Sequence, residues 1–311
     1  MYRSACVESS VQLLRRPAKG SVLATSTEPA GMRARELVQP AKLPIGQPVE
    51  LRTIDSAATP GFTGGRTDGI ALTTQLAPTL AELQEKLFAE GTSGMNRSVL
   101  LVLQGMDTAG KGGTVKHVLG QVDPMGVHYH AFKMPTVQEL SHDFLWRIRK
   151  ELPRPGIIGV FDRSHYEDVV ATRVHGSIDR PTWLRRFAAI NRFENDLVAN
   201  GTAVIKCFLH ISADEQRRRL MARLTDPTKQ WKFNPHDTDE RARWSDYSVA
   251  YSEALERTNT EVAPWHIIPA DRKWWRNLMV TSLLIDTLEG MSPAYPAPPY
   301  DVDYEMARLM E

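Results

Sequence analysis

The chain has 311 residues, 42% of them hydrophobic and 24% charged, which is ordinary for a globular enzyme of one large domain or two. Its 38 Lys and Arg residues are balanced by 37 Asp and Glu residues, so the net charge of +1 argues against nucleic acid or an anionic membrane as partner. No apolar stretch approaches the roughly 20 residues that span a bilayer, and Cys6 and Cys207 lie in contexts too different for a disulfide framework, so we expect a cytoplasmic protein with no membrane or nucleic-acid partner.

The first part of the chain shows little periodicity. Residues 1–45 are rich in Pro, Gly, Ser and Thr, which predicts a disordered N-terminal extension, and an irregular lead-in continues to about residue 75. Apolar residues then recur at helical spacing from Leu76 to Gly91, which predicts the first helix. We expect a folded domain over 46–290, followed by a Pro-rich C-terminal tail over 291–311.

Beyond this helix, strand-like and helix-like segments alternate. The predicted strands are 98–104, 127–132, 157–161, 203–211 and 266–269. The predicted helices begin at Lys111 and cover 137–150, 166–174, 181–200, 213–224, 239–258 and 273–288. This alternation predicts an α/β fold with a parallel sheet, helices on both of its faces, and ligands at the carboxyl ends of the strands.

A glycine-rich loop follows the first predicted strand. Between Gly105 and Lys111 the chain reads G-x-x-x-x-G-K, where a strand gives way to a helix. Glycines let successive backbone N–H groups converge on an anion, the N-terminus of the helix attracts it, and the lysine adds a full positive charge. The residues expected to bind phosphate in this way are Gly105, Gly110, Lys111, Gly112 and Gly113.

Two acids are the candidates for a metal site. A Ser or Thr usually follows the lysine of such a loop and holds Mg²⁺, but here Gly112 takes that place while Asp107 stands inside the loop. Asp162 follows the apolar strand 157–161 and belongs to the same sheet edge, where a carboxylate holds Mg²⁺ directly or through water. We predict Asp107 and Asp162 as ligands of Mg²⁺, with Mn²⁺ as an alternative. A competing interpretation makes Asp162 the cap of the helix near Tyr166.

Positive charge follows in two places. Arg163 suits either an ion pair with a neighbouring acid or a bidentate contact with phosphate, and its position favours the phosphate. Six further cations lie close together in the sequence, namely Arg217, Arg218, Arg219, Arg223, Lys229 and Lys232. One interpretation is a solvated helix face with a pair between Glu215 and Arg219. The other is a lid over about 213–240, because Pro227 breaks the helix into a loop that bears the two lysines.

Three separated motifs resemble the family-2 polyphosphate kinases. They read L-Q-G-M-D-T-A-G-K-G-G from Leu103, F-D-R-S-H-Y-E-D-V from Phe161 and D-P-T-K-Q-W-K-F from Asp226. The segment A-P-W-H-I-I-P-A-D-R-K-W from Ala263 is similar to the closing segment of that family. The motifs occur in the order of the family, and the similarity covers roughly residues 50–290.

This resemblance implies a P-loop kinase fold similar to thymidylate kinase, with a basic helical lid. It also implies Mg²⁺-dependent, reversible phosphoryl transfer between inorganic polyphosphate and nucleoside mono- or diphosphates, AMP to ADP and ADP to ATP. Adenine or guanine nucleotides and a homo-oligomer, dimer or tetramer, are expected with it. The S-H-Y-E-D sequence after Arg163 resembles the subgroup that accepts AMP as well as ADP, so Glu167 is the candidate for acceptor choice, and Arg173 is a second nucleotide-binding candidate.

The residues and the resemblance agree on how catalysis would work. An acceptor phosphate oxygen is already ionised at neutral pH, so cations and metal must bring two polyanions together and stabilise the transferred group. The predicted catalytic residues are Asp107, Lys111, Asp162, Arg163 and Arg223. Guidance of the polyphosphate chain is assigned to Arg217, Arg218, Lys229 and Lys232.

Three other functions compete with this one. An ATP-dependent nucleotide kinase would share the loop and the lid but would normally keep Ser or Thr where Gly112 stands. A non-catalytic nucleotide- or polyphosphate-binding module of GTPase type would need an N-K-x-D element, which the sequence lacks. A nucleic-acid-binding protein is disfavoured by the balanced charge.

Overall fold

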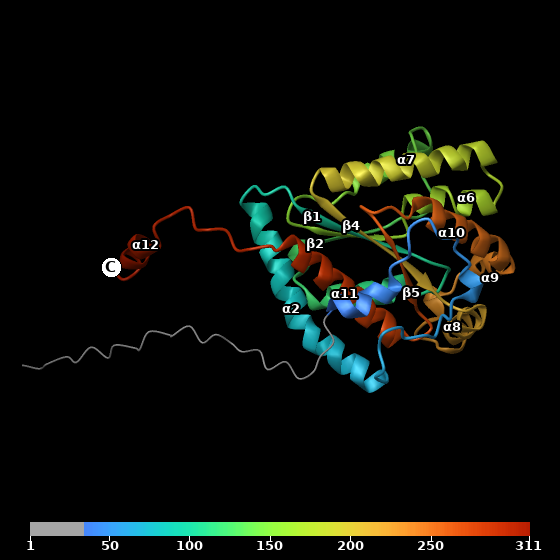
Figure 1. The fold of residues 1–311 in the computed structure, drawn as a ribbon, viewed down its shortest axis with the longest axis horizontal. Helices are drawn as coiled ribbons and strands as arrows, with labels where there is room; N and C mark the ends of the chain where they lie inside the picture. Colours follow the sequence, from blue (N-terminus) through green and yellow to red (C-terminus); the bar gives the residue numbers. More distant parts are fainter. Residues whose placement is uncertain (1–33) are drawn as a thin grey trace, which may run out of the picture. The chain divides into compact units, whose positions relative to one another are not determined.

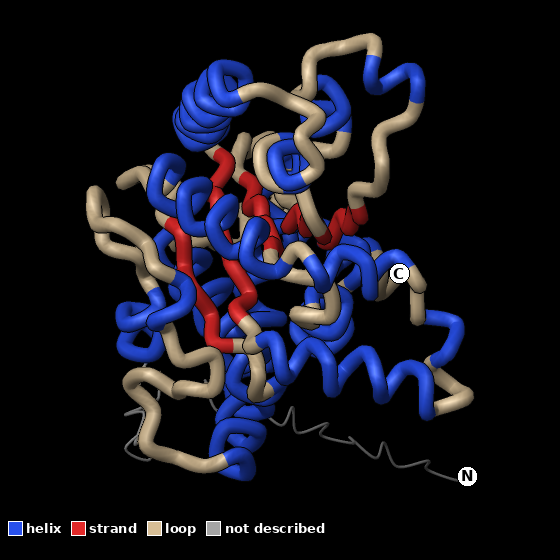
Figure 2. Tube along the Cα trace, turned by 90° about the vertical axis from the view of Figure 1, so that its right-hand side faces the viewer, coloured by secondary structure: helices blue, strands red, loops and turns tan. Residues whose placement is uncertain are grey.

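The structure, a computed structural model, describes residues 34–311. Five parallel strands form one sheet in the order β2-β3-β1-β4-β5. Their bounds are β1 Ser98–Gln104, β2 Val127–Ala131, β3 Ile158–Asp162, β4 Thr202–His210 and β5 Trp265–Pro269. Since all strands run in one direction, their carboxyl ends lie at one edge of the sheet, and Figure 2 shows the strands enclosed by helices.

Helices cover both faces of the sheet (Figure 1). On one face lie α1 Ala34–Val38, α2 Arg66–Thr92, α3 Lys111–Val118 and α11 Lys273–Met291. On the other face lie α6 Ala171–Val174, α7 Arg180–Ala199 and α10 Trp244–Thr258. All seven residues of β1 are buried, as a central strand covered on two sides requires. The alternation of strands and helices predicted from the sequence is therefore confirmed.

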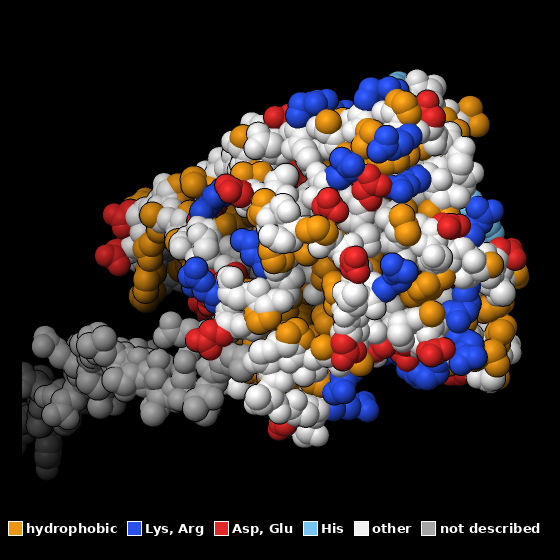
Figure 3. All heavy atoms as spheres, turned by 45° about the vertical axis from the view of Figure 1, so that its right-hand side comes forward, with side chains coloured by type: hydrophobic (Ala, Val, Ile, Leu, Met, Phe, Trp, Pro, Cys, Tyr) orange, Lys and Arg blue, Asp and Glu red, His pale blue; other side chains and the backbone are white. Residues whose placement is uncertain are grey.

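Five further α-helices complete the described part of the chain. They are α4 Val137–Leu140, α5 Trp146–Lys150, α8 Ala213–Thr225, α9 His236–Ala242 and α12 Val302–Arg308. Among the described residues, no helix combines the length and the apolar character that a membrane crossing requires. Acidic and basic side chains are interspersed on the face that Figure 3 shows, in keeping with the balanced charge.

The folded part begins earlier than predicted. Residues 1–45 were expected to be disordered, but Ala34–Val38 form α1 and pack on α11, with Leu37 fully buried. Leu43 then donates its N–H to the carbonyl of Trp265 at 2.8 Å. These contacts are with parts of the chain that are distant in sequence. A helix of five residues is also too short to show a periodic pattern of apolar residues, so the sequence did not predict it. The first 33 residues of the predicted extension lie outside the described part of the chain.

Several helix bounds also differ from the prediction. Helix α2 begins at Arg66, ten residues before Leu76, and continues through Pro78. Proline removes one helical hydrogen bond, but Thr74, whose carbonyl loses its partner, is exposed to water. The predicted helix over 137–150 is two short helices, α4 and α5, and the one over 239–258 is α9 followed by α10. The segment 166–174 is a 3-10 turn, His165–Asp168, followed by α6.

A buried ion pair joins α7, one of the helices that cover the sheet, to strand β4. Lys206 of β4 is 0% exposed and donates to Glu194 of α7 at 2.7 Å, to the hydroxyl of Tyr166 at 3.1 Å and to the carbonyl of Thr258 at 2.6 Å. Tyr166 donates its hydroxyl to Glu194 at 2.7 Å. The pair therefore ties β4, α7, the end of α10 and the turn after β3 to one another.

We predict that Lys206→Met lowers the free energy of unfolding by about 3–5 kcal/mol, because it leaves the carboxylate of Glu194 buried without its cation. The double variant Lys206→Met/Glu194→Leu should recover most of this loss, since neither charge then remains buried. Urea unfolding of both variants measures the difference. A double variant no more stable than Lys206→Met would contradict this account.

Candidate active site

The sheet brings the glycine-rich loop and Asp162 to one edge. Leu103 of β1 lies opposite Asp162 of β3, so the loop leaves β1 just beyond the end of β3. Gly105 has φ +146°, and a Cβ there would lie 2.6 Å from the carbonyl of Leu209. Gly110 has φ +111° and precedes α3 directly. These two glycines are thus required by the path of the backbone, as expected of a loop that folds around an anion.

Lys111 reaches back across this loop. It is 8% exposed, and its Nζ donates to the carbonyl of Gly105 at 2.9 Å. The N–H of Thr114 is bonded to the carbonyl of Gly110, which starts the hydrogen-bond ladder of α3. The lysine charge and the N-terminus of α3 therefore converge at one place, and this geometry suits a phosphate group.

Asp162 stands beside the first turn of α3. Its Oδ2 lies 4.0 Å from the position that a Cβ of Gly112 would occupy and accepts a hydrogen bond from Tyr129 at 3.4 Å. It does not cap the following turn, because the hydroxyl of Ser164 accepts from the N–H of Tyr166 instead. The capping interpretation of Asp162 is therefore wrong. One long hydrogen bond leaves most of the lone pairs of this carboxylate free, which fits a ligand of a hard cation such as Mg²⁺.

Asp107, Arg163 and Glu167 form a chain of charges next to the loop. Arg163 donates from Nη2 to Asp107 at 2.6 Å, and its Nη1 lies 3.7 Å from the carboxylate of Glu167. These two acids raise the pKa of Arg163, Glu167 most strongly, so it stays charged. Burial raises the pKa of Glu167, and Arg163 opposes that shift. Arg163 is held with φ +65°, a left-handed conformation that is strained for a residue with a side chain.

Sequence reasoning missed Gln104, the last residue of β1. It is 0% exposed, and the amide orientation that satisfies its neighbours donates to Glu167 at 3.1 Å and accepts from Ser164 at 3.0 Å. The hydroxyl of Tyr251 lies 3.3 Å from the amide atom that faces Glu167. The signal in the sequence that could have identified Gln104 is a polar residue at the end of an apolar, strand-like run. Gln104 fixes the orientation of the Glu167 carboxylate relative to the loop.

Two arginines of α8 have different surroundings. Arg219 is buried, donates to the carbonyls of Thr108 and Ala109 at 2.8 and 2.9 Å, and pairs with Glu215 at 2.6 Å. The pair predicted between Glu215 and Arg219 is therefore confirmed, and this arginine supports the loop from behind. Arg223, one turn further along α8, is held at the start of α9.

Arg223 donates to Asp237 at 3.1 Å and to the carbonyl of Lys232 at 3.0 Å. Burial and the charge of Asp107 raise the pKa of Asp237, while Arg223 and Arg163 lower it. Asp237 therefore lies within electrostatic range of the loop, although the sequence did not single it out. The structure thus brings Arg223 and the start of α9 toward the predicted catalytic acids.

The remaining predicted residues have partners of their own. Arg217 pairs with Asp214, Arg218 with Glu215 and Lys229 with Asp226, while Lys232 lies over the ring of Trp231. Arg173 donates to Glu253 at 2.6 Å and lies 4.4 Å from the ring centre of Trp183. None of these contacts is with the loop or with Asp162, so the roles assigned to these residues in binding polyphosphate or nucleotide stay predictions.

Residues 66–296 match the family described as Polyphosphate kinase 2 (PPK2). The chain belongs to this family. An AMP/ADP-polyphosphate phosphotransferase from Meiothermus ruber is 44% identical over 249 residues, which cover 80% of this kinase and 92% of the relative. An ADP-polyphosphate phosphotransferase from Rhodopseudomonas palustris is 42% identical over 229 residues, which cover 70% and 78%.

The structure of the kinase is also similar to the crystal structure of polyphosphate kinase 2 from Arthrobacter aurescens. The TM-score is 0.87 at 50% sequence identity, and the match covers 90% of this chain and 99% of the other. The P-loop kinase fold and the family resemblance predicted from the sequence are therefore confirmed.

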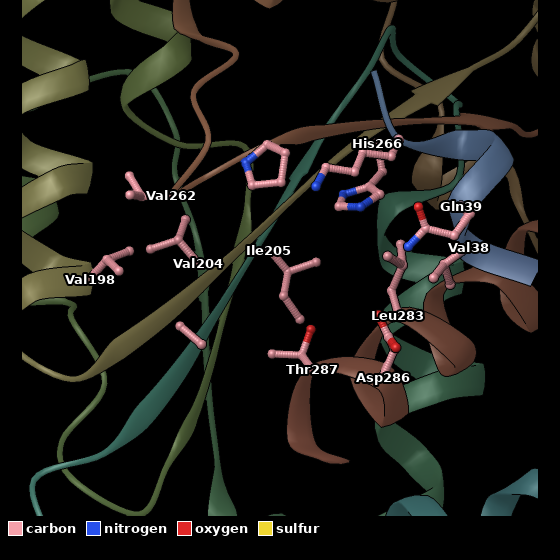
Figure 4. A pocket seen from close by; sticks show the side chains of 13 residues that line it. Val38, Gln39, Val198, Val204, Ile205, Val262, His266, Leu283, Asp286 and Thr287 are labelled. Carbon is pink, nitrogen blue, oxygen red and sulfur yellow. The ribbon is translucent and has the colours of Figure 1, made fainter. Parts of the chain in front are cut away.

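A cavity of about 280 Å³ lies away from the glycine-rich loop of the kinase, at the amino ends of β4 and β5. Figure 4 shows Ile205, Leu283, Asp286 and His266 around it. His266 is 9% exposed, and burial lowers its pKa to about 4. This cavity lies at the opposite ends of the strands from Gly105 and Asp162, so it is separate from the candidate active site.

The buried imidazole of His266 predicts a pH dependence of stability. Its folded-state pKa of about 4 lies below the unfolded value near 6.5, so the unfolded chain alone binds a proton in between. The free energy of unfolding should therefore fall by up to about 3 kcal/mol as the pH falls from 6.5 to 4. His266→Gln should flatten this part of the profile in urea unfolding, whereas exposed His117→Gln should keep it. Equal slopes for wild type and His266→Gln would refute the assignment.

Proposed function

We propose that this kinase transfers a phosphoryl group between inorganic polyphosphate and AMP or ADP, reversibly and with Mg²⁺. One observation carries the proposal: the glycine-rich loop lacks a hydroxyl after Lys111, while Asp107 and Asp162 lie at the same sheet edge, where their carboxylates could hold a metal instead. The names of the two relatives from Meiothermus ruber and Rhodopseudomonas palustris support these substrates.

Different residues of the site bind the phosphate and neutralise its charge. Lys111 exchanges the carbonyl of Gly105 for an oxygen of the bound phosphate, and the backbone N–H groups at the start of α3 hold the other oxygens. Arg163 and Arg223 neutralise the charge of the transferred group from the other side, where Asp107 and Asp237 now hold them. No side chain needs to act as a strong base, because the acceptor oxygen is already ionised.

A metal ion would complete this arrangement. Asp162 and Asp107 supply the hard oxygen ligands that Mg²⁺ prefers, with Mn²⁺ as the alternative, and Gly112 leaves space beside Asp162. When bound, the ion neutralises phosphate charge and orients the donor and the acceptor. The protein groups then keep both polyanions in line for the transfer.

Acceptor choice is assigned to Glu167. Its carboxylate is fixed by Gln104 and Arg163 next to the loop, so it can discriminate between nucleotides that differ by one phosphate. Arg173 is retained as a second nucleotide contact, since its ion pair with Glu253 is partly exposed. We also propose adenine or guanine nucleotides as substrates, a homo-oligomer and a cytoplasmic location.

We predict that Lys111→Ala and Asp162→Asn each reduce phosphoryl transfer by ~10²-fold or more, because each removes a charge that stabilises the transition state. Purified protein is mixed with Mg²⁺, polyphosphate and either AMP or ADP, and the formation of ADP and ATP is followed. Lys116→Ala, an exposed lysine on the same helix, is the matched control and should keep full activity. Wild-type inactivity with every nucleotide, in both directions, would overturn the proposed function.

A separate prediction concerns Glu167→Asn. We expect it to change the ratio of AMP use to ADP use several-fold while the KM for polyphosphate stays near the wild-type value, because Glu167 lies with Asp107 around Arg163, where we place the acceptor nucleotide. Initial rates with each nucleotide at saturating polyphosphate measure the ratio. The control is Glu139→Gln, a change in an acidic residue that caps α4. A parallel loss of activity with both nucleotides would contradict a selective role.

A further inference from the structure

The side of the phosphate loop that faces α11 carries buried positive charge without a matching acid. Arg276, in the first turn of α11, is 2% exposed. Its Nε and Nη2 both donate to the side-chain oxygen of Asn277, at 3.2 and 2.8 Å. Within residues 34–311 it forms no ion pair with an acid, and its Nη1 has no hydrogen-bond acceptor. A buried cation is costly unless an anion compensates its charge.

Arg276 lies directly against the loop. A Cβ at Gly110 would fall 1.8 Å from its Nη1, and a Cβ at Gly113 would fall 3.1 Å from its Nη2. Neighbouring residues of a helix point about 100° apart around its axis. Asp162, which approaches the Cβ position of Gly112, therefore lies on a different side of α3 from Arg276. The N-terminus of this helix has an acidic side and a cationic side.

Other cations share the second side. Burial and the nearby charge of Arg219 lower the pKa of Arg276 to about 10. The pKa of Lys273 is lowered by burial and by the charges of Arg219, Arg218 and Arg276. Like charges thus lie close enough together to repel one another in the absence of an anion.

The acids that face this cluster already have partners. Glu215 accepts hydrogen bonds from both Arg218 and Arg219. The carboxylate of Asp271 accepts from the N–H and hydroxyl of Ser212 and from the hydroxyl of Ser56. Neither acid contacts Arg276, so its charge is left for a group that the protein does not supply.

We propose that Arg276 and Lys273 bind the phosphate group that adjoins the one held by the loop, so that the polyphosphate chain leaves the loop along the N-terminus of α11. This inference rests on the proposed function and adds the direction of the donor chain. The planar guanidinium presents several donors to phosphate oxygens. On the opposite side Asp107, Asp162 and Glu167 repel a long polyanion, and the metal and acceptor occupy that side.

The test is Arg276→Gln, studied by calorimetric titration with tripolyphosphate and with orthophosphate, both in Mg²⁺. Tripolyphosphate should bind ~10-fold or more weakly than to the wild type, because a hydrogen bond to a charged group is lost. Orthophosphate, which fills the loop alone, should change by less than ~3-fold. The variant should unfold at the same urea concentration as the wild type or a higher one, since no acid loses a partner. Arg308→Gln, an exposed arginine of α12, is the control.

Unchanged tripolyphosphate affinity of a folded Arg276→Gln protein would overturn the inference. Lower stability with unchanged affinity would instead assign a structural role and would overturn it too. If Arg276→Gln does not fold, Lys273→Met takes its place and should weaken tripolyphosphate binding several-fold, with unchanged affinity again the negative result. Transfer to AMP or ADP by the wild type is measured in parallel. Its absence would refute the proposed function, whereas Arg276-dependent binding of tripolyphosphate would still support this subsite.

Discussion

The parallel pairing of β1 with β3 is the constraint on which the rest of the site depends. It places Leu103 opposite Asp162, so a loop from one strand and a carboxylate from the next end at one edge of the sheet. The pairing of β1 with β4 adds Leu209, whose carbonyl leaves room only for glycine at position 105. An antiparallel neighbour would have sent its acid to the opposite edge. Parallel topology therefore brings together the loop and the carboxylate that we propose for phosphate and metal binding.

The turn that follows β3 is held by groups outside the candidate active site. Lys206 and Glu194 are buried together, and Glu194 accepts the hydroxyl hydrogen of Tyr166 within this turn. Because these contacts hold the turn in place, Arg163 can be kept in a strained left-handed conformation beside Asp107. By contrast, Arg223 contacts Asp237 of α9 and the carbonyl of Lys232, so its contacts do not involve the sheet.

Charge is divided around the start of α3. Asp107, Asp162 and Glu167 lie toward β3, while Arg219, Lys273 and Arg276 lie toward α11. This division suits a reaction between two polyanions, because metal and acceptor can gather on one side while the donor chain extends along the other. The net charge of +1 gives no sign of this local division of charge.

Local sequence determined the loop, the acid after β3, the alternation of elements and the break at Pro227, because glycine spacing, hydrophobic period and proline each act over a few residues. Tertiary structure decided the rest. Short helix α1 is stable only by packing on α11, and Gln104 meets Glu167 only when two strand ends converge. Arg219 and Arg223 lie four residues apart on one helix, yet only the folded structure shows that one supports the loop and the other meets α9. Arg276 gave no sequence signal, since its missing counter-charge is visible only after folding brings α11 against the loop.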